Sequence, residues 1–173
     1  MLNRLKKSDK GFTIIEVMIV LAIAGLILLI VFLAVPALQR NSRNTSRKND
    51  VGRIASALNE WESNHNGITF TAGTGNANLT EVINSVGNLS QYTLVAAGAI
   101  GANSFTVATG AQAAMAGGTN NVNLGSVQVV TGATCAAAAD GSTTASTSTR
   151  RLAVQYLVEQ GTGGVTPQCL DVQ

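Results

Sequence analysis

The chain has 173 residues, of which 12% are charged and 4% aromatic, and its formal net charge is +2. Residues 1–11 hold four basic side chains against one acid, Asp9, whereas the rest of the chain holds seven basic and eight acidic side chains. The basic excess therefore predicts contact between the N-terminus and an anionic membrane face, and it argues against a nucleic-acid-binding domain in the remainder. The length allows one domain plus appendages, with a thin core.

A long apolar stretch follows the basic N-terminus. Residues 17–35 are nineteen residues without a charge, an amide or a hydroxyl. A helix of this length spans about 28 Å, close to the thickness of a bilayer's hydrocarbon core, and a single span in lipid has to be helical. A secretory signal peptide fits poorly, because the stretch is too long and no small-x-small cleavage site ends it. A plain membrane anchor fits the stretch but explains neither Gly11 nor Glu16.

The start of the apolar stretch resembles the signature of the type IV pilin family. GFTIIE at residues 11–16 supplies Gly11, Phe12 and Glu16 between a basic leader and an apolar helix. The basic residues of the leader are Arg4, Lys6, Lys7 and Lys10. The resemblance covers residues 1 to about 67. It implies that a prepilin peptidase removes residues 1–11 by cutting after Gly11, that the new amine of Phe12 is methylated, and that the leader is cytoplasmic while the head is outside.

Glu16 is the only charged residue in the apolar helix. An ionised carboxylate there is costly unless it is paired or reaches the interface. Nothing else within residues 12–35 is expected to pair with it, so we expect it to meet the Phe12 amine of a neighbouring subunit and to set the stagger between helices. The alternative is that Glu16 reaches the lipid headgroups and does nothing for assembly.

Pro36 predicts a kink or break in the helix, because proline lacks an N–H and crowds the preceding turn. The resemblance implies that Gly25 and Pro36 bound a segment that loosens when subunits enter a filament, and a simple kink at Pro36 is the alternative. Residues 12–36 are therefore expected to form the transmembrane and filament-core helix.

Residues 37–64 are expected to continue this helix into a globular head. Residues 39–50 contain no apolar side chain. The residues that follow place one apolar stripe at helical spacing: Val51, Ile54, Ala55, Leu58 and Trp61. Residues 64–67 supply a stop signal, with Gly67 suited to a left-handed cap.

Residues 65–173 are expected to form the head. Residues 78–86 predict a short helix with a capping box, and alternating residues predict strands near residues 105–107, 122–124, 127–130 and 152–158. We expect residues 127–130 and 152–158 to form a hairpin closed by an exposed loop, residues 136–149. The predicted fold class is α+β and pilin-like: a long N-terminal helix, first apolar and then amphipathic, with a small antiparallel sheet packed on its C-terminal half.

Two cysteines, Cys135 and Cys169, lie near the C-terminal end. An exported chain with such a pair favours one disulfide, which stabilises by about 3–4 kcal/mol in the chain-entropy model. Two buried free thiols are the alternative. The pair also resembles the disulfide-bounded C-terminal region of pilins.

Enzyme chemistry finds little support in the sequence. His65 is the only histidine and lies in a helix-stop context, where a surface position is expected. The sequence has no phosphate-binding loop, nucleophile elbow or metal-ligand spacing, so we expect no catalytic residue, no metal and no cofactor. Residues 142–149 are rich in Ser and Thr and are expected to form a flexible loop rather than a glycosylated one.

The resemblance implies a structural subunit of a type IV pilus, held in the cytoplasmic membrane before assembly and in an extracellular filament afterwards. Its expected partners are copies of itself in a helical homopolymer, a prepilin peptidase and methyltransferase, and the inner-membrane pilus assembly machinery. The filament would serve adhesion, twitching motility or DNA uptake. The alternatives are a pseudopilin of a type II secretion system, a minor pilin, or a membrane-anchored adhesive domain.

Overall fold

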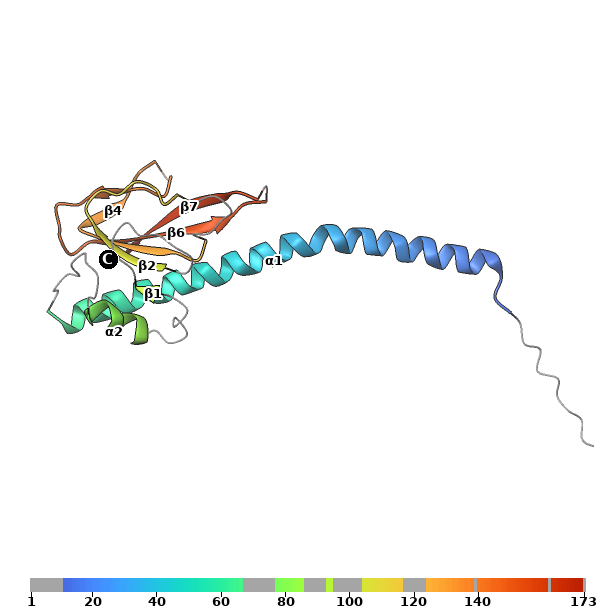
Figure 1. Cartoon of the computed structure of the whole chain (residues 1–173), viewed down its shortest axis with the longest axis horizontal. Helices are drawn as coiled ribbons and strands as arrows, with labels where there is room; N and C mark the ends of the chain where they lie inside the picture. The colour runs from blue at the N-terminus through green and yellow to red at the C-terminus, as the bar shows by residue number, and fades with distance from the viewer. Residues whose placement is uncertain are drawn as a thin grey trace, which may run out of the picture. The chain divides into compact units, whose positions relative to one another are not determined.

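The structure, a computed structural model, describes residues 11–66, 77–85, 93–94, 104–116, 124–138, 140–161 and 163–172. The chain divides into two compact units, Met1–Gln39 and Arg40–Gln173. The described elements are α1 (Ile14–Asn64), α2 (Ala77–Ser85), β1 (Thr93–Leu94), β2 (Ser104–Thr109), β3 (Val127–Thr131), β4 (Ala133–Cys135), β5 (Thr143–Ala145), β6 (Leu152–Glu159) and β7 (Val165–Val172) (Figure 1).

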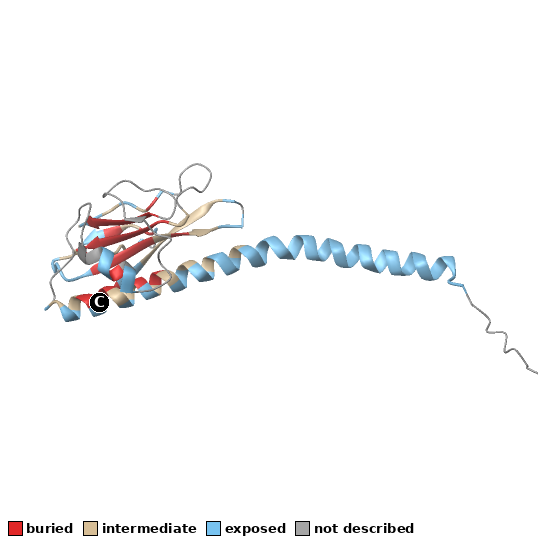
Figure 2. Ribbon diagram, turned by 60° about the horizontal axis from the view of Figure 1, so that its bottom comes forward, coloured by how far each residue is buried: buried red, intermediate tan, exposed pale blue. Residues whose placement is uncertain are grey.

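In the first unit, the described residues are one exposed apolar helix. Every described residue from 11 to 39 is exposed, as the pale blue part of α1 in Figure 2 shows. The helix runs through Pro36 without a break, whereas a kink there, the other outcome that the sequence predicts, stays a prediction. A proline removes only one N–H from the hydrogen bonds of the helix, and the neighbouring Ala34, Ala37 and Leu38 are good helix formers. The helix therefore continues through Pro36.

In the second unit, the C-terminal half of α1 packs on the sheet through the predicted stripe. Its buried residues are Val51, Ile54, Leu58 and Trp61. The stripe is buried because spacings of three and four residues keep these side chains on one face of a helix. The helix ends at Asn64, as predicted, but the left-handed residue is Asn66, with φ of 55°, while Gly67 lies outside the described residues.

In the part of the chain that the structure describes, the main sheet has five strands in the order β1-β2-β3-β6-β7. β3 and β6 form the predicted antiparallel hairpin, with Val129 opposite Val154, and β7 pairs antiparallel with β6. The pairs β1–β2 and β2–β3 are parallel, so the sheet is mixed rather than wholly antiparallel. Period-two alternation reports a strand but not its direction, and a parallel neighbour is set by the crossover between strands.

The central strands β2, β3 and most of β6 are buried on both faces. The face against α1 contributes apolar residues to one core cluster: Phe105, Val107, Val127, Val129, Leu152, Val154 and Val172. Residues that alternate with these belong to the other face, where Ala108 and Val130 form a second cluster with Ala133 of β4. The fold is therefore α+β, with a long N-terminal helix and a small sheet packed on its C-terminal half.

Three strand expectations need correction. The predicted loop 136–149 contains β5, which pairs with β4 in a two-stranded sheet. Leu124 lies in a turn rather than a strand, and Val122 lies outside the described residues. β7 was not predicted, because its sequence contains Pro167 and shows no alternation of apolar and polar residues. An edge strand needs no such alternation, and in β7 only the last residue, Val172, is fully buried. The short helix α2 confirms the prediction over residues 78–86 to within one residue.

Candidate functional site

The predicted cleavage site, between Gly11 and Phe12, is exposed and precedes the first residue of α1. The Phe12 side chain is 89% exposed. A Cβ atom added to Gly11 would meet no atom within 4 Å. The folded chain therefore places no steric demand on Gly11, and a requirement for glycine there has to come from a partner that approaches the backbone closely. Residues 1–10 lie outside the described residues.

Thr13 and Glu16 form a capping box at the start of α1. The Thr13 backbone N–H and hydroxyl each donate to Oε2 of Glu16 at 2.8 Å, and the Glu16 N–H donates to Oγ1 of Thr13 at 3.4 Å. Thr13 is thus the N-cap and Glu16 the third helical residue, the geometry of an S/T-x-x-E box. The negative carboxylate also lies at the positive end of the helix dipole.

The capping box corrects the expectation that nothing else in residues 12–35 pairs with Glu16. The T-x-x-E spacing is readable in the sequence, but the expectation considered charged partners of Glu16 and not the neutral donors of Thr13. Both hydrogen bonds from Thr13 reach Oε2 of Glu16. No donor in the described part of the chain bonds to Oε1. Oε1 is therefore available to a second donor.

Gly25 and Pro36 both lie inside α1, on the exposed part of the helix. A Cβ atom added to Gly25 would meet nothing within 4 Å, so the single chain does not use this glycine for close packing. The role of Gly25 and Pro36 in loosening the helix stays a prediction.

Cys135 and Cys169 are joined in a disulfide. The bond links the end of β4 to the edge strand β7, and the Cys135 N–H also donates to the Asp171 carboxylate at 2.7 Å. Gly141 lets the chain approach β7 closely, because a Cβ atom at this position would lie only 2.6 Å from Cβ of Pro167. The C-terminal region is thus fixed to the sheet by covalent and close contacts.

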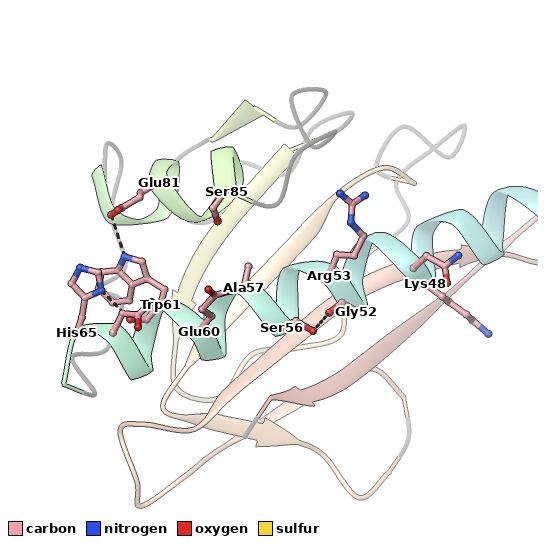
Figure 3. A pocket seen from close by; sticks show the side chains of 12 residues that line it. Lys48, Gly52, Arg53, Ser56, Ala57, Glu60, Trp61, His65, Glu81 and Ser85 are labelled. Atoms are coloured by element: carbon pink, nitrogen blue, oxygen red, sulfur yellow. Dashed lines mark hydrogen bonds between the residues drawn. The ribbon is translucent and has the colours of Figure 1, made fainter.

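An open groove lies between α1 and α2 (Figure 3). At one end the Trp61 ring stacks on His65 with 4.0 Å between centroids, and the Trp61 Nε1–H donates to Glu81 of α2 at 3.3 Å. His65, expected at the surface, is half-buried by this contact. Lys48 and Arg53 line the other part of the groove. No group of three His, Cys, Asp or Glu side chains suited to a metal ion occurs among the described residues.

Comparison with known proteins locates the recognisable part of the chain at its N-terminus. Residues 6–32 match the family model of the prokaryotic N-terminal methylation motif. No curated protein and no solved structure matches the chain. The matched residues include Gly11, Phe12, Thr13 and Glu16, and they overlap α1, the described helix long and apolar enough to cross a membrane. The chain therefore carries a type IV pilin-like prepilin signature.

Proposed function

We propose that the chain is the structural subunit of a type IV pilus and that it polymerises through the N-terminal half of α1. The observation that carries this proposal is the coincidence of the methylation motif at residues 6–32 with a helix whose residues 14–39 are all exposed. So large an apolar surface is not stable in water and needs lipid or other helices around it. A membrane supplies that cover before assembly, and neighbouring copies supply it in a filament.

Processing precedes assembly in this proposal. A prepilin peptidase cuts after Gly11. The same enzyme, or a methyltransferase associated with it, then methylates the Phe12 amine. The exposed and unpacked backbone at Gly11 supports the cut, because an extended chain without a side chain can enter a protease cleft. The inner-membrane assembly machinery then receives a subunit that begins at Phe12.

In the filament, the Glu16 carboxylate accepts a hydrogen bond from the protonated Phe12 amine of a neighbouring subunit. The capping box supports this role, because Thr13 holds the carboxylate through Oε2 and leaves Oε1 for a second donor. A cation on Oε1 would neutralise the carboxylate among packed apolar helices, where an unpaired charge is costly.

The methylation motif fits a pseudopilin or a minor pilin as well as a main pilus subunit. The disulfide between Cys135 and Cys169 favours the pilus, because a filament outside the cell is exposed to shear, which a covalent cross-link in the head resists. Adhesion, motility and DNA uptake are the functions that such a filament would serve.

Surface filaments sheared from the cells test the proposal. Negative-stain microscopy should show thin fibres, and their main protein should have the mass of residues 12–173 plus one CH2 unit, because the methyl group replaces a hydrogen, and minus the two hydrogens lost in the disulfide. Fibres built from another chain would contradict the proposal. A surface protein that retains residues 1–11 would instead indicate a membrane-anchored domain.

A further inference from the structure

A polar cluster joins α1 to the end of β6. It consists of Arg43, Asn44 and Arg47 of α1 with Glu159, the last residue of β6, and we call it the Glu159 clamp. All four residues belong to the unit Arg40–Gln173. The clamp joins residues that lie 112 to 116 positions apart in the sequence.

The backbone of Glu159 is held by the side chain of Asn44. The Asn44 amide nitrogen donates to the Glu159 carbonyl at 2.9 Å, and the Glu159 N–H donates to Oδ1 of Asn44 at 2.8 Å. The amide thus satisfies both backbone groups of the last strand residue, as a neighbouring strand would. This fixes the end of β6 on one turn of α1.

The carboxylate of Glu159 is held by two arginines. Arg43 donates through Nε at 2.9 Å and through Nη2 at 2.6 Å, one bond to each carboxylate oxygen, and Arg47 adds a bond from Nη2 at 2.9 Å. The Glu159 side chain is only 12% exposed, and that of Arg47 only 19%. Arg43, which makes the bidentate pair, is itself 51% exposed. The two-bond geometry, together with the shielding of Glu159 and Arg47, makes the cluster more directional than an ordinary surface ion pair.

The clamp lies where the apolar core gives no support to α1. Residues 39–50 contain no apolar side chain, and the first buried residue of the helix is Val51. Asn44 and Arg47 precede Val51 by seven and four residues, so they continue the buried stripe on the same face of the helix. The sheet therefore holds α1 by apolar contacts from Val51 onward and by the clamp over the two turns before it.

We infer that the Glu159 clamp is a conformational stop, which keeps residues 43–50 of α1 helical and attached to the sheet while the helix before Arg43 is free to move or unwind. Without the clamp, the hold of the sheet on the helix would begin at Val51. The proposed function gives the stop a use in a filament, because it would preserve the attachment of the head when the apolar half of α1 changes conformation. The inference itself concerns the single chain.

Amide hydrogen exchange of the full-length protein in detergent micelles tests the stop. Glu159→Gln removes the charge that both arginines bind, and Asn44→Ala removes the two bonds to the backbone. In each variant, peptides covering residues 43–50 should exchange about tenfold faster or more, as expected when hydrogen bonds that hold a segment against local opening are lost. Peptides covering residues 51–61 should keep their wild-type rates, because the buried stripe still holds them.

Glu60→Gln is the matched control, because it makes the same change of charge at an exposed position of the same helix. It should leave exchange at residues 43–50 unchanged. Arg43→Lys keeps the positive charge but loses the bidentate geometry, so a smaller acceleration is expected, and this milder variant serves if the others fail to accumulate.

Two results would overturn the inference. In one, residues 43–50 exchange at the wild-type rate in Glu159→Gln and Asn44→Ala. In the other, residues 51–61 accelerate as much as residues 43–50, which would make the clamp a general stabiliser of the head. Neither outcome depends on filament formation, so failure of the proposed pilus function would leave this measurement interpretable.

Discussion

Gly11 has no packing role in the folded chain, and this makes it a clean position for a processing test. A side chain at Gly11 would meet no described atom within 4 Å, so a bulky substitution should not disturb folding. In the proposed function, the requirement for glycine comes from the peptidase alone. The effect of a substitution there should therefore be confined to cleavage.

Gly11→Leu should leave the precursor uncut in the membrane. Leucine matches the apolar neighbourhood and adds no charge, so insertion should proceed, while its side chain should block the approach of the protease to the backbone. Intact mass of the membrane fraction measures the result, with Gly25→Leu as a control that adds the same side chain to an equally open position. Normal removal of residues 1–11 from Gly11→Leu would refute the assigned cleavage site.

At the scale of elements, the disulfide joins the two-stranded sheet to the edge strand of the main sheet. Among the described residues, β4 pairs with the three-residue strand β5, and β7 lies at the edge of the main sheet and pairs with β6. Cys135 and Cys169 connect these strands across a sequence separation of 34 residues. The bond should therefore stabilise the C-terminal part of the chain more than the N-terminal helix.

Cys169→Ser should destabilise the head by about 3 kcal/mol, the loss expected when a loop of this length is released in the unfolded state. Trp61 is the single tryptophan and is buried in the core, so its fluorescence during urea unfolding measures the change. Leader removal should be unaffected, because Gly11 lies outside the unit that holds the disulfide. Native protein in which both cysteines react with an alkylating reagent would contradict the bond itself.

The Glu159 clamp also makes a pH-dependent contribution at this scale. Hydrogen bonds from Arg43, and then those from Arg47, lower the pKa of Glu159 from its ordinary 4.5 to about 2, although burial opposes them. The group is thus more acidic when folded, so its stabilisation is complete above pH 4.5 and is lost as the pH falls toward 2. Burial raises the pKa of Glu62, so the contribution of Glu62 to stability changes with pH in the opposite direction to that of Glu159. A variant at Glu159 is therefore needed to separate the two contributions.

Between pH 5 and pH 2.5, the wild-type head should lose about 1–2 kcal/mol more stability than Glu159→Gln. This figure is smaller than the full pKa shift would give, because Arg43 is half-exposed and solvent screens its charge. Urea unfolding followed by Trp61 fluorescence at several pH values gives both curves. Because the variant retains Glu62 and the other acids, its curve is the baseline. Parallel curves for the two proteins would show that the clamp carries no titrating stabilisation.

At the scale of the whole molecule, the sequence predicted the features that are local and periodic. The stripe from Val51 to Trp61 and the alternation in β6 each lie within one element, so their periods were readable. The parallel pairing of β2 with β3 was not, because strand direction depends on distant connections. The Glu159 clamp was missed for the same reason, since polar residues at Asn44 and Arg47 look solvated until Glu159 is placed beside them.

The capping box at Thr13 and Glu16 was readable, and it changes how the assembly hypothesis is tested. Glu16 both caps its own helix and, in the proposed filament, pairs with the Phe12 amine of a neighbour. A variant that removes the whole side chain removes both roles together. Two variants separate them. Glu16→Gln keeps an oxygen for the Thr13 donors but loses the charge, and Thr13→Val loses the N-cap hydroxyl but keeps the carboxylate.

If the charge pair drives assembly, Glu16→Ala and Glu16→Gln should be inserted and cleaved but should fail to enter filaments formed beside wild-type subunits. Thr13→Val should enter them, because losing a cap weakens the helix start by only about 1 kcal/mol, and the carboxylate for the neighbour's amine remains. Mass spectrometry of sheared filaments from cells that express both chains measures the ratio of variant to wild type. Exclusion of Thr13→Val together with incorporation of Glu16→Gln would assign the assembly defect to the cap instead, because the uncharged amide would then suffice. Incorporation of Glu16→Ala at the wild-type level would remove the charge pair from the mechanism, since an apolar residue at position 16 offers neither a cap nor a partner for the amine.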